Sequence, residues 1–518
     1  MTKEMFIREP YLLDSNASDW AEPEEIKQAS TIKKIHCSQK QTDAAGLPII
    51  SDGYTTYVDN SDSHTLIFGS TGSKKTRLFA MPLLNIFALA GESFVVADPK
   101  GELYQKTSGF VSKKGYDTIV LNFRDMEQSD QWNPLQIPYE LYHAGDTEKA
   151  MEMINDLLTV LAEPQRRQTK DVYFIDLAYG ITLAYMLFFI ETATKEEANI
   201  ASFLNFFIEY TTPEHTQTIV QLMTPGSIAH LNLKGVLTTV AAEKTFGNII
   251  STAVAMFSLF TMQRSLCKLI SNNSCDITKI GKQKTAVYLI VPDEKNTLHT
   301  LVTIFVKQSY EIVIAEAQKE KNRQLPVRLN FLLDEFGNMP TIPDMPSMIT
   351  AARSRNIRFF LMGQGIYQIN NKYKGEVETF IGNCDNLVFL SSKEPELLRK
   401  FSELCGTKTD GNPLISVGGL QKLQKGWDKS EVLILHSRNL PFVSVLPDID
   451  WYGFKTEKPI ERQNKELPQI TRYDYKTIKS KICDGYEPIA FSMEVHGEHR
   501  YLKAKPEKPK DKKDLYEW

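Results

Sequence analysis

The chain has 518 residues, 42% of them hydrophobic and 24% charged, which suits two or three soluble globular domains. A formal net charge of −4 excludes a general attraction to nucleic acid, so DNA contacts require local basic clusters or an assembled ring. The six cysteines include no CxxC pair, which predicts neither a zinc site nor a disulfide framework.

Residues 1–60 are rich in Asp, Glu, Ser and Lys and carry no long apolar run, which predicts an irregular or partly ordered lead-in without a signal peptide. The longest uncharged windows are Leu177–Ile190, which is too short to span a bilayer, and Thr245–Gln263, which carries several polar residues. Both windows are predicted to be buried helices. We therefore expect a soluble chain that is at most peripherally attached to a membrane.

A phosphate-binding loop is indicated directly after the lead-in. An apolar run, Thr65–Phe68, precedes a Gly/Ser-rich segment, and a predicted helix, Arg77–Leu89, follows it. Strand, glycine-bearing loop and helix in this order are the setting that a P-loop requires, in which backbone N–H groups wrap the phosphates of a nucleotide. The segment consists of Gly69, Ser70, Thr71, Gly72, Ser73, Lys74, Lys75 and Thr76.

Two side chains of this loop are candidates for chemistry, and a third departs from the pattern. Lys75 would reach the phosphate oxygens, and the Thr76 hydroxyl would bind Mg²⁺. Lys74 stands where the second glycine of the pattern is usual. If that position needs a positive φ, a lysine there costs on the order of 1 kcal/mol and its side chain must point away from the phosphates. The alternative is a Gly/Ser-rich turn that happens to precede a helix.

The following elements predict an α/β fold with a parallel-rich central sheet. Strands at 93–97 and 118–122 flank the turn Asp98–Glu102 and a helix at 103–114. Helical periodicity then predicts an inserted all-α domain over 135–275. Strands resume at 286–291, 329–333, 357–362 and 386–390, with weaker ones at 432–435 and 443–446. The predicted nucleotide-binding domain thus comprises 61–134 and 276–460, and 461–518 form a C-terminal extension with a disordered lysine-rich tail.

The strand Leu329–Leu333 ends in Asp334 and Glu335, as a Walker B motif requires. The first acid would support Mg²⁺ and the second would polarise the attacking water. The alternative is a surface acid pair after an edge strand. Further on, Arg353 and the strand-end Gln364 have the spacing of an arginine finger and a phosphate sensor, although Arg353 is equally compatible with an ordinary surface arginine.

With these motifs in order, the chain resembles the TraG/TraD-type coupling proteins of conjugative type IV secretion systems. The resembling segments begin at the loop, Gly69–Thr76, and continue through FVVADPKGELYQKT (94–107), GYDTIVLNFRDMEQSDQWNP (115–134), VYLIVPD (287–293), FLLDEFGN (331–338) and IGNCDNLVFL (381–390). The resemblance implies a RecA-like P-loop domain bearing an all-α domain. It further implies an ATP- and Mg²⁺-dependent homo-hexamer that moves single-stranded DNA with its relaxase toward secretion channel components.

The same resemblance assigns the site residues by position. Lys75 and Thr76 match the P-loop lysine and hydroxyl, Asp334 and Glu335 the Walker B acids, Arg353 the arginine finger and Gln364 the sensor. The family usually begins with transmembrane helices, so the chain resembles a soluble branch, expected in the cytoplasm and at the inner face of the membrane only through partners.

Two alternatives to the coupling-protein function stay open, one because Lys74 replaces the usual glycine and one because related DNA pumps have the same ATPase core. One is a nucleotide-binding adaptor that recruits substrate without efficient hydrolysis, and the other is a related DNA-pumping ATPase in plasmid maintenance or phage defence. Basic residues in the helical insert (Arg166, Arg167 and Lys170) are candidates for single-strand contacts or, equally, a solvated helix end.

Overall fold

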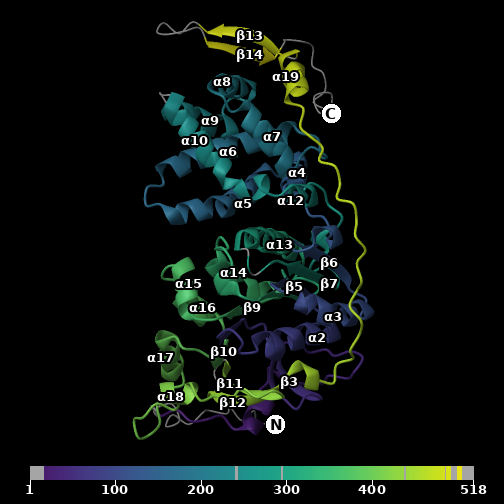
Figure 1. Cartoon of the computed structure of the whole chain (residues 1–518), viewed down its shortest axis with the longest axis vertical. Coiled ribbons are helices and arrows are strands. Elements are labelled where there is room, and N and C mark those ends of the chain that lie inside the picture. The colour runs from purple at the N-terminus through teal and green to yellow at the C-terminus, as the bar shows by residue number, and fades with distance from the viewer. Residues whose placement is uncertain are drawn as a thin grey trace, which may run out of the picture. The chain divides into compact units, whose positions relative to one another are not determined.

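The computed structural model describes residues 17–239, 243–292, 294, 296–436, 439–484, 486–491 and 499–504. The chain divides into two compact units (Figure 1). The first comprises Met1–Arg124, Ile277–Val302 and Ser309–Arg462, and the second comprises Asp125–Asp276, Thr303–Gln308 and Gln463–Trp518. The second unit thus begins at Asp125 rather than at the expected 135, and it includes most of the C-terminal extension.

The first unit is built on a sheet that, among the described residues, has nine strands in the order β12-β11-β10-β4-β9-β8-β5-β7-β6. Strands β10 through β6 in this order are parallel, whereas β11 and β12 extend the sheet in antiparallel pairing. The strands are β4 (Thr65–Gly69), β5 (Ser93–Asp98), β6 (Asp117–Asn122), β7 (Thr285–Ile290), β8 (Leu329–Leu333), β9 (Ile357–Gly363), β10 (Asn386–Ser391), β11 (Lys429–His436) and β12 (Phe442–Pro447).

Helices cover both faces of this sheet (Figure 1). On one face, Phe87 of α2 packs against Phe360 of β9, with ring centroids 5.4 Å apart. The next residue back, Phe359, points to the opposite face and contacts Tyr310 of α13 at 6.2 Å. The helices of the first unit are α1 (Pro23–Gln28), α2 (Met81–Ala90), α3 (Glu102–Lys113), both ends of α13 (His299–Lys319), α14 (Met345–Ala352), α15 (Ile366–Lys372), α16 (Val377–Asn383), α17 (Pro395–Leu404) and α18 (Val417–Leu420).

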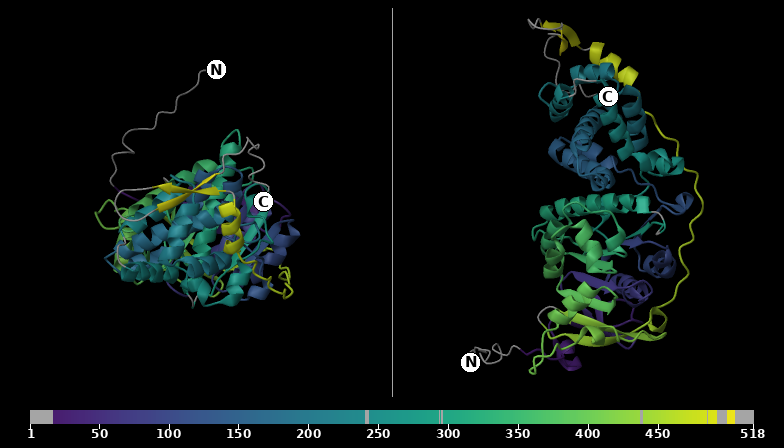
Figure 2. Two further views of the ribbon diagram at one scale, coloured as in Figure 1. Left: turned by 90° about the horizontal axis from the view of Figure 1, so that it is seen from above. Right: turned by 60° about the vertical axis from the view of Figure 1, so that its left-hand side comes forward.

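The described part of the lead-in forms regular strands, where an irregular or partly ordered segment was expected. Strands β1 (Ile32–His36), β2 (Leu47–Ser51) and β3 (Thr55–Asp59) form an antiparallel sheet in the order β1-β3-β2. Their few apolar side chains are buried in the same core as α2. Ser444 of β12 donates to the carbonyl of Ile49 in β2 at 2.6 Å. Figure 2 shows the yellow-green strands of the main sheet beside the purple lead-in. Residues 1–16 lie outside the described residues.

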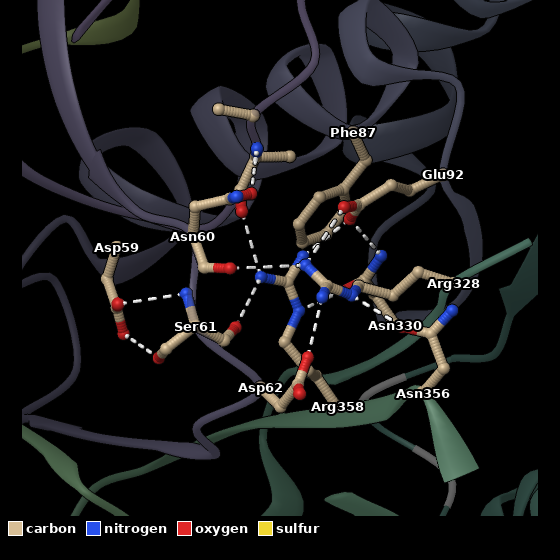
Figure 3. Close-up of polar contacts among 12 residues, drawn as sticks. Asp59, Asn60, Ser61, Asp62, Phe87, Glu92, Arg328, Asn330, Asn356 and Arg358 are labelled. Carbon is tan, nitrogen blue, oxygen red and sulfur yellow. Dashed lines mark hydrogen bonds and ion pairs between the residues drawn. The ribbon is translucent and has the colours of Figure 1, made fainter. Parts of the chain in front are cut away.

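A buried polar network also holds the segment before β4 (Figure 3). Arg358 of β9 is 1% exposed, and it donates to Asn330 at 2.8 Å and to the carbonyl of Ala45 at 2.8 Å. Its second terminal nitrogen pairs with Glu92, which also lies 3.4 Å from Arg328. Because each buried charge has a partner of opposite sign, the network fixes the lead-in to the strands of the main sheet.

The second unit is helical over most of its length. Its elements are η3 (Met126–Gln128), α4 (Gln136–His143), α5 (Thr147–Gln168), α6 (Tyr173–Thr192), α7 (Ile200–Tyr210), α8 (Pro213–Leu222), α9 (Ile228–Thr239), α10 (Glu243–Met256), α11 (Ser258–Thr261), α12 (Arg264–Leu269), α19 (Tyr475–Asp484), β13 (Tyr486–Phe491) and β14 (His499–Ala504). Tyr473 packs on Phe189 and Phe206 with ring centroids 5.1 and 5.0 Å away, so part of the extension belongs to this core. The predicted disordered tail falls mainly on residues 505–518, which lie outside the described residues.

Helix α6 is longer than the apolar window seen in the sequence. It is the one helix among the described residues that is long and apolar enough to cross a membrane by length and composition alone. In this structure 67% of its apolar window is buried inside the protein, which agrees with the prediction that this segment is a buried helix.

Candidate nucleotide site

The strand order brings three distant motifs to one edge of the main sheet. Strand β9 lies between β4 and β8, with Phe68 paired to Gly363 and Leu333 paired to Leu361. The Gly69–Thr76 segment follows β4, the two acids follow β8, and Gln364 follows β9. Because the carboxyl ends of parallel strands meet at the same edge, these motifs are adjacent although far apart in sequence.

The loop itself is tightly built. A Cβ placed on Gly69 would lie 2.3 Å from the Ser73 hydroxyl, so a larger residue there would displace the Ser73 side chain. Ser70 anchors the loop to the end of β10, because its N–H donates to the carbonyl of Ser391 at 2.9 Å. Gly72 has φ 77° and open space around it. The loop then passes through a π-helical turn, η2 (Thr76–Ala80), into α2.

The two candidate phosphate and metal side chains of the loop, Lys75 and Thr76, face Asp334 and Glu335. Lys75 is 6% exposed, and its amine donates to the carbonyl of Gly69 at 2.6 Å and lies 3.7 Å from the Glu335 carboxylate. The Thr76 hydroxyl donates to Asp334 at 3.0 Å. This pair joins residues 258 positions apart.

Glu335 is held in an unusual backbone conformation, with φ 55°. Its carboxylate accepts hydrogen bonds from the amides of Gln364 and Asn338, each at 2.9 Å. Non-glycine residues with positive φ are costly and collect at functional sites, because the surrounding structure must hold them there. A carboxylate that is fixed by two donors and still partly open to solvent is suited to orient a water molecule.

Acidic side chains gather at the ends of two adjacent strands, Asp334 and Glu335 after β8 and Asp98 at the end of β5. Burial, followed by the charge of Glu335, raises the pKa of Asp334, while Lys75 opposes this shift. Asp98, at the end of β5, also has its pKa raised by burial, to about 6, although it accepts a hydrogen bond from the N–H of Tyr104. Asp98 was not predicted as a site residue, and its place directly after an apolar strand is the signal that marks it.

Lys74 has the positive φ that favours glycine, 71°, and its side chain contacts the segments beside β11 and β12. Its amine donates to Asp448 at 2.8 Å and to the carbonyl of Trp427 at 2.9 Å. Arg77 binds the same Asp448 carboxylate. Although burial opposes ionisation of Asp448, the hydrogen bonds from Arg77 and Lys74 keep its pKa below the usual range. Sequence reasoning missed Asp448, since nothing local marks it.

Arg353 does not lie with these residues in one chain. It begins the short helix η7 (Arg353–Arg355) before β9, and it pairs with Asp385, before β10, at 2.8 Å. Arg353 is therefore at the amino edge of the sheet, about 20 Å of strand length from the P-loop edge. Within one chain Arg353 is therefore separated from Lys75 and the loop by the length of a strand.

The basic residues of the insert lie at the end of α5 and are largely paired. Arg166 contacts Asp176 at 2.6 Å, and Arg167 pairs with Glu163 one helical turn earlier. Of the two interpretations of these residues, contacts to single-stranded DNA or an ordinary solvated helix end, the ion pairs fit the second. No group of three or more His, Cys, Asp or Glu side chains in the described part of the chain is arranged to hold a metal ion.

The strand order and the loop geometry define a RecA-like P-loop fold, as predicted. The chain belongs to the family described as type IV secretory system conjugative DNA transfer, whose model matches residues 19–440. This confirms the resemblance to TraG/TraD-type coupling proteins. A search of curated proteins found no match.

Solved structures show the same fold at low sequence identity. The bacterial conjugative coupling protein TrwBΔN70, in its unbound monoclinic form, has a TM-score of 0.54 and 14% identity over 87% of this chain and 96% of that chain. TrwB with the non-hydrolysable ATP analogue ADPNP has a TM-score of 0.54 and 12% identity, covering 89% and 96%. TrwB with ADP and Mg²⁺ has a TM-score of 0.50 and 14% identity, covering 87% and 96%.

Proposed function

We propose that this chain is a coupling ATPase of conjugative DNA transfer that binds ATP with Mg²⁺ at the Gly69–Thr76 loop. The observation that carries the proposal is the contact of Thr76 with Asp334, 3.0 Å long. A hydroxyl directly after the P-loop lysine, bonded to a strand-end acid, is the arrangement that holds Mg²⁺ in P-loop proteins. The TrwB structures with ADPNP and with ADP and Mg²⁺ share this fold and support the proposal.

The loop fits a phosphate group by its own shape and chemistry. The Ser73 hydroxyl is buried without a hydrogen-bond partner in the described structure, and the space beside Gly72 is open. Backbone N–H groups of the loop and the Lys75 amine would bind the phosphate oxygens. Thr76 and Asp334 would hold Mg²⁺, which neutralises the charge that develops on the phosphates.

Glu335 would orient and deprotonate the attacking water. Gln364 and Asn338 hold its carboxylate, so the proton acceptor is already placed when substrate binds. Arg353 would act on the phosphates bound by a neighbouring copy, because it lies at the opposite sheet edge of its own chain. That role requires a ring, and we propose the homo-hexamer that the family resemblance implies.

In this proposal the motor moves single-stranded DNA with its relaxase toward the type IV secretion channel. The chain would work in the cytoplasm and reach the membrane through partner proteins. Family membership supports this substrate and these partners.

A second candidate is an adaptor that binds nucleotide and recruits substrate without efficient hydrolysis. The observation that favours it is Lys74, whose positive φ replaces the usual glycine in the phosphate loop. Both candidates use the same loop, and they differ only in turnover.

The test is DNA-stimulated ATP hydrolysis by purified protein, compared with nucleotide affinity. Lys75→Ala should lose both, whereas Glu335→Gln should keep affinity and lose turnover by at least about a hundredfold. Lys113→Ala, a surface lysine of α3, is the matched control. Activity of Lys75→Ala equal to that of the parent would remove the P-loop assignment. An inactive parent, with turnover gained in Lys74→Gly, would establish the adaptor.

A further inference from the structure

The P-loop is tied to the last strands of the main sheet through one carboxylate. Asp448 follows β12 directly and precedes the short helix η8 (Ile449–Trp451). Its side chain is 3% exposed, against 18% for Lys74. Lys74 donates to one carboxylate oxygen at 2.8 Å, and Nε of Arg77 donates to the other at 2.9 Å. A nearly buried acid thus holds two cations from the phosphate loop and the turn after it.

Lys74 needs such an anchor because of its backbone. A lysine at φ 71° is strained by on the order of 1 kcal/mol, a strain that glycine in its place would not have. Left to itself, the residue favours a negative φ, and relaxation would turn the adjoining N–H groups out of the loop. Those N–H groups form the anion-binding concavity, so relaxation would damage the site.

The anchor fixes the end of the side chain at two points. Besides Asp448, the amine donates to the carbonyl of Trp427 at 2.9 Å, in the turn before β11. With both acceptors on the β11–β12 side, the ammonium stays clear of the space over the loop. Arg77 supplies a second positive charge, which keeps the Asp448 carboxylate ionised and oriented.

We propose that Asp448 is a positioning residue of the nucleotide site. By holding Lys74 in the left-handed conformation with its charge turned away, it allows a lysine to occupy the usual glycine position without loss of the phosphate loop. The inference rests on the proposed function, because it takes the loop to be the nucleotide site.

A purely structural role is the competing explanation, since Asp448 also accepts the N–H of Asp450 at 3.4 Å at the start of η8. The two explanations differ in their dependence on residue 74. Glycine tolerates positive φ unaided, so a positioning role disappears in a Lys74→Gly background, whereas a structural role persists.

The experiment is a double-mutant cycle of Asp448→Asn and Lys74→Gly, with Asp448→Glu as the conservative variant. Glu457→Gln, which removes an ion pair with Lys113 elsewhere in the unit, is the control. One readout is amide hydrogen exchange of peptides covering residues 69–76 without nucleotide. The other is the equilibrium Kd for a fluorescent ATP analogue.

Asp448→Asn should speed exchange across the loop and weaken nucleotide binding about tenfold in the parent, but less than twofold with Lys74→Gly. Asp448→Glu should recover most of the loss, and Glu457→Gln should match the parent. Equal losses in both backgrounds, or no loss in either, would overturn the inference. Absence of nucleotide binding in every protein would overturn only the proposed function, because exchange without nucleotide still decides whether Asp448 holds the loop.

Discussion

The side-chain amide of Gln364 donates a hydrogen bond to the Glu335 carboxylate at 2.9 Å. The two residues follow adjacent parallel strands, β9 and β8, so the sheet itself sets their separation. Gln364 was expected to sense the phosphate, and in this structure its contact is with the acid that would activate water. A change at Gln364 should therefore act on turnover through Glu335.

Replacing Gln364 with Ala removes one of the two donors that orient Glu335. We expect ATP hydrolysis to fall about tenfold while nucleotide affinity stays within about twofold, because phosphate binding depends on other groups. Steady-state hydrolysis and equilibrium binding of a fluorescent analogue measure the two quantities. The exposed Gln421, changed to Ala, is the control. A loss of affinity as large as the loss of turnover would contradict this role.

If Arg353 acts across a subunit boundary, two inactive variants should complement each other. Arg353→Ala and Glu335→Gln are each expected to abolish turnover in the pure ring. In a mixture of equal amounts, about one quarter of the interfaces combine an intact Glu335 with an intact Arg353 from the neighbour, and activity should return to about that fraction. Hydrolysis measured across mixing ratios is the test. A mixture that stays inactive would place Arg353 outside the site.

The network of Figure 3 predicts a large stability cost for one conservative change. Glu92→Gln leaves Arg358, which is fully buried, without its carboxylate partner, and the unfolding free energy should fall by about 3 kcal/mol. Glu457→Gln breaks a more exposed pair and should cost below about 1 kcal/mol. Urea unfolding followed by circular dichroism gives both values. Similar small effects for the two variants would contradict the network's role.

His64 makes stability depend on pH. Burial lowers its pKa from 6.5 to about 4, and the ring bonds the carbonyl of Ile349 at 2.8 Å and the N–H of Phe359 at 3.0 Å. In the unfolded chain the His64 ring becomes protonated below about pH 6.5, whereas in the folded chain it stays neutral down to about pH 4. The stability from His64 is therefore complete above pH 6.5, and about 2 kcal/mol of it is lost by pH 5.

The matching experiment compares urea unfolding of the parent and of His64→Gln at pH 7.5 and pH 5. His64→Gln should be less stable at pH 7.5 but should lose less on acidification. Parallel losses in the two proteins would assign the pH dependence to other groups.

Much of the main sheet was predictable, because parallel strands buried on both faces are nearly continuous apolar runs. Strand β8 (Leu329–Leu333) is one example and strand β4 (Thr65–Gly69) is another, since every residue of both is buried. The lead-in strands were missed because each has only five residues, and β1 places two lysines between Ile32 and Ile35. Their order comes from packing on α2 and from Arg358, contacts that local sequence does not reveal.

The contrast between local sequence signals and long-range packing also explains which residues of the candidate site were predicted. Lys75 and Asp334 stand in local motifs, so their chemistry could be inferred before their geometry. Asp448 carries no motif, and its contact with Lys74 exists only because β12 completes the sheet. Arg353 matched a spacing, but spacing does not tell at which edge of a sheet a residue lies.

The contact between Lys74 and Asp448 has a consequence for the order in which the protein is made. The loop residue and its anchor are 374 positions apart, so the ribosome produces the loop long before the residue that supports it. At a synthesis rate of about 5–20 residues per second, the nascent loop waits on the order of half a minute. During that interval Lys74 has no Asp448 to bind, so the contact that holds its side chain forms only when the last strands of the sheet have been made.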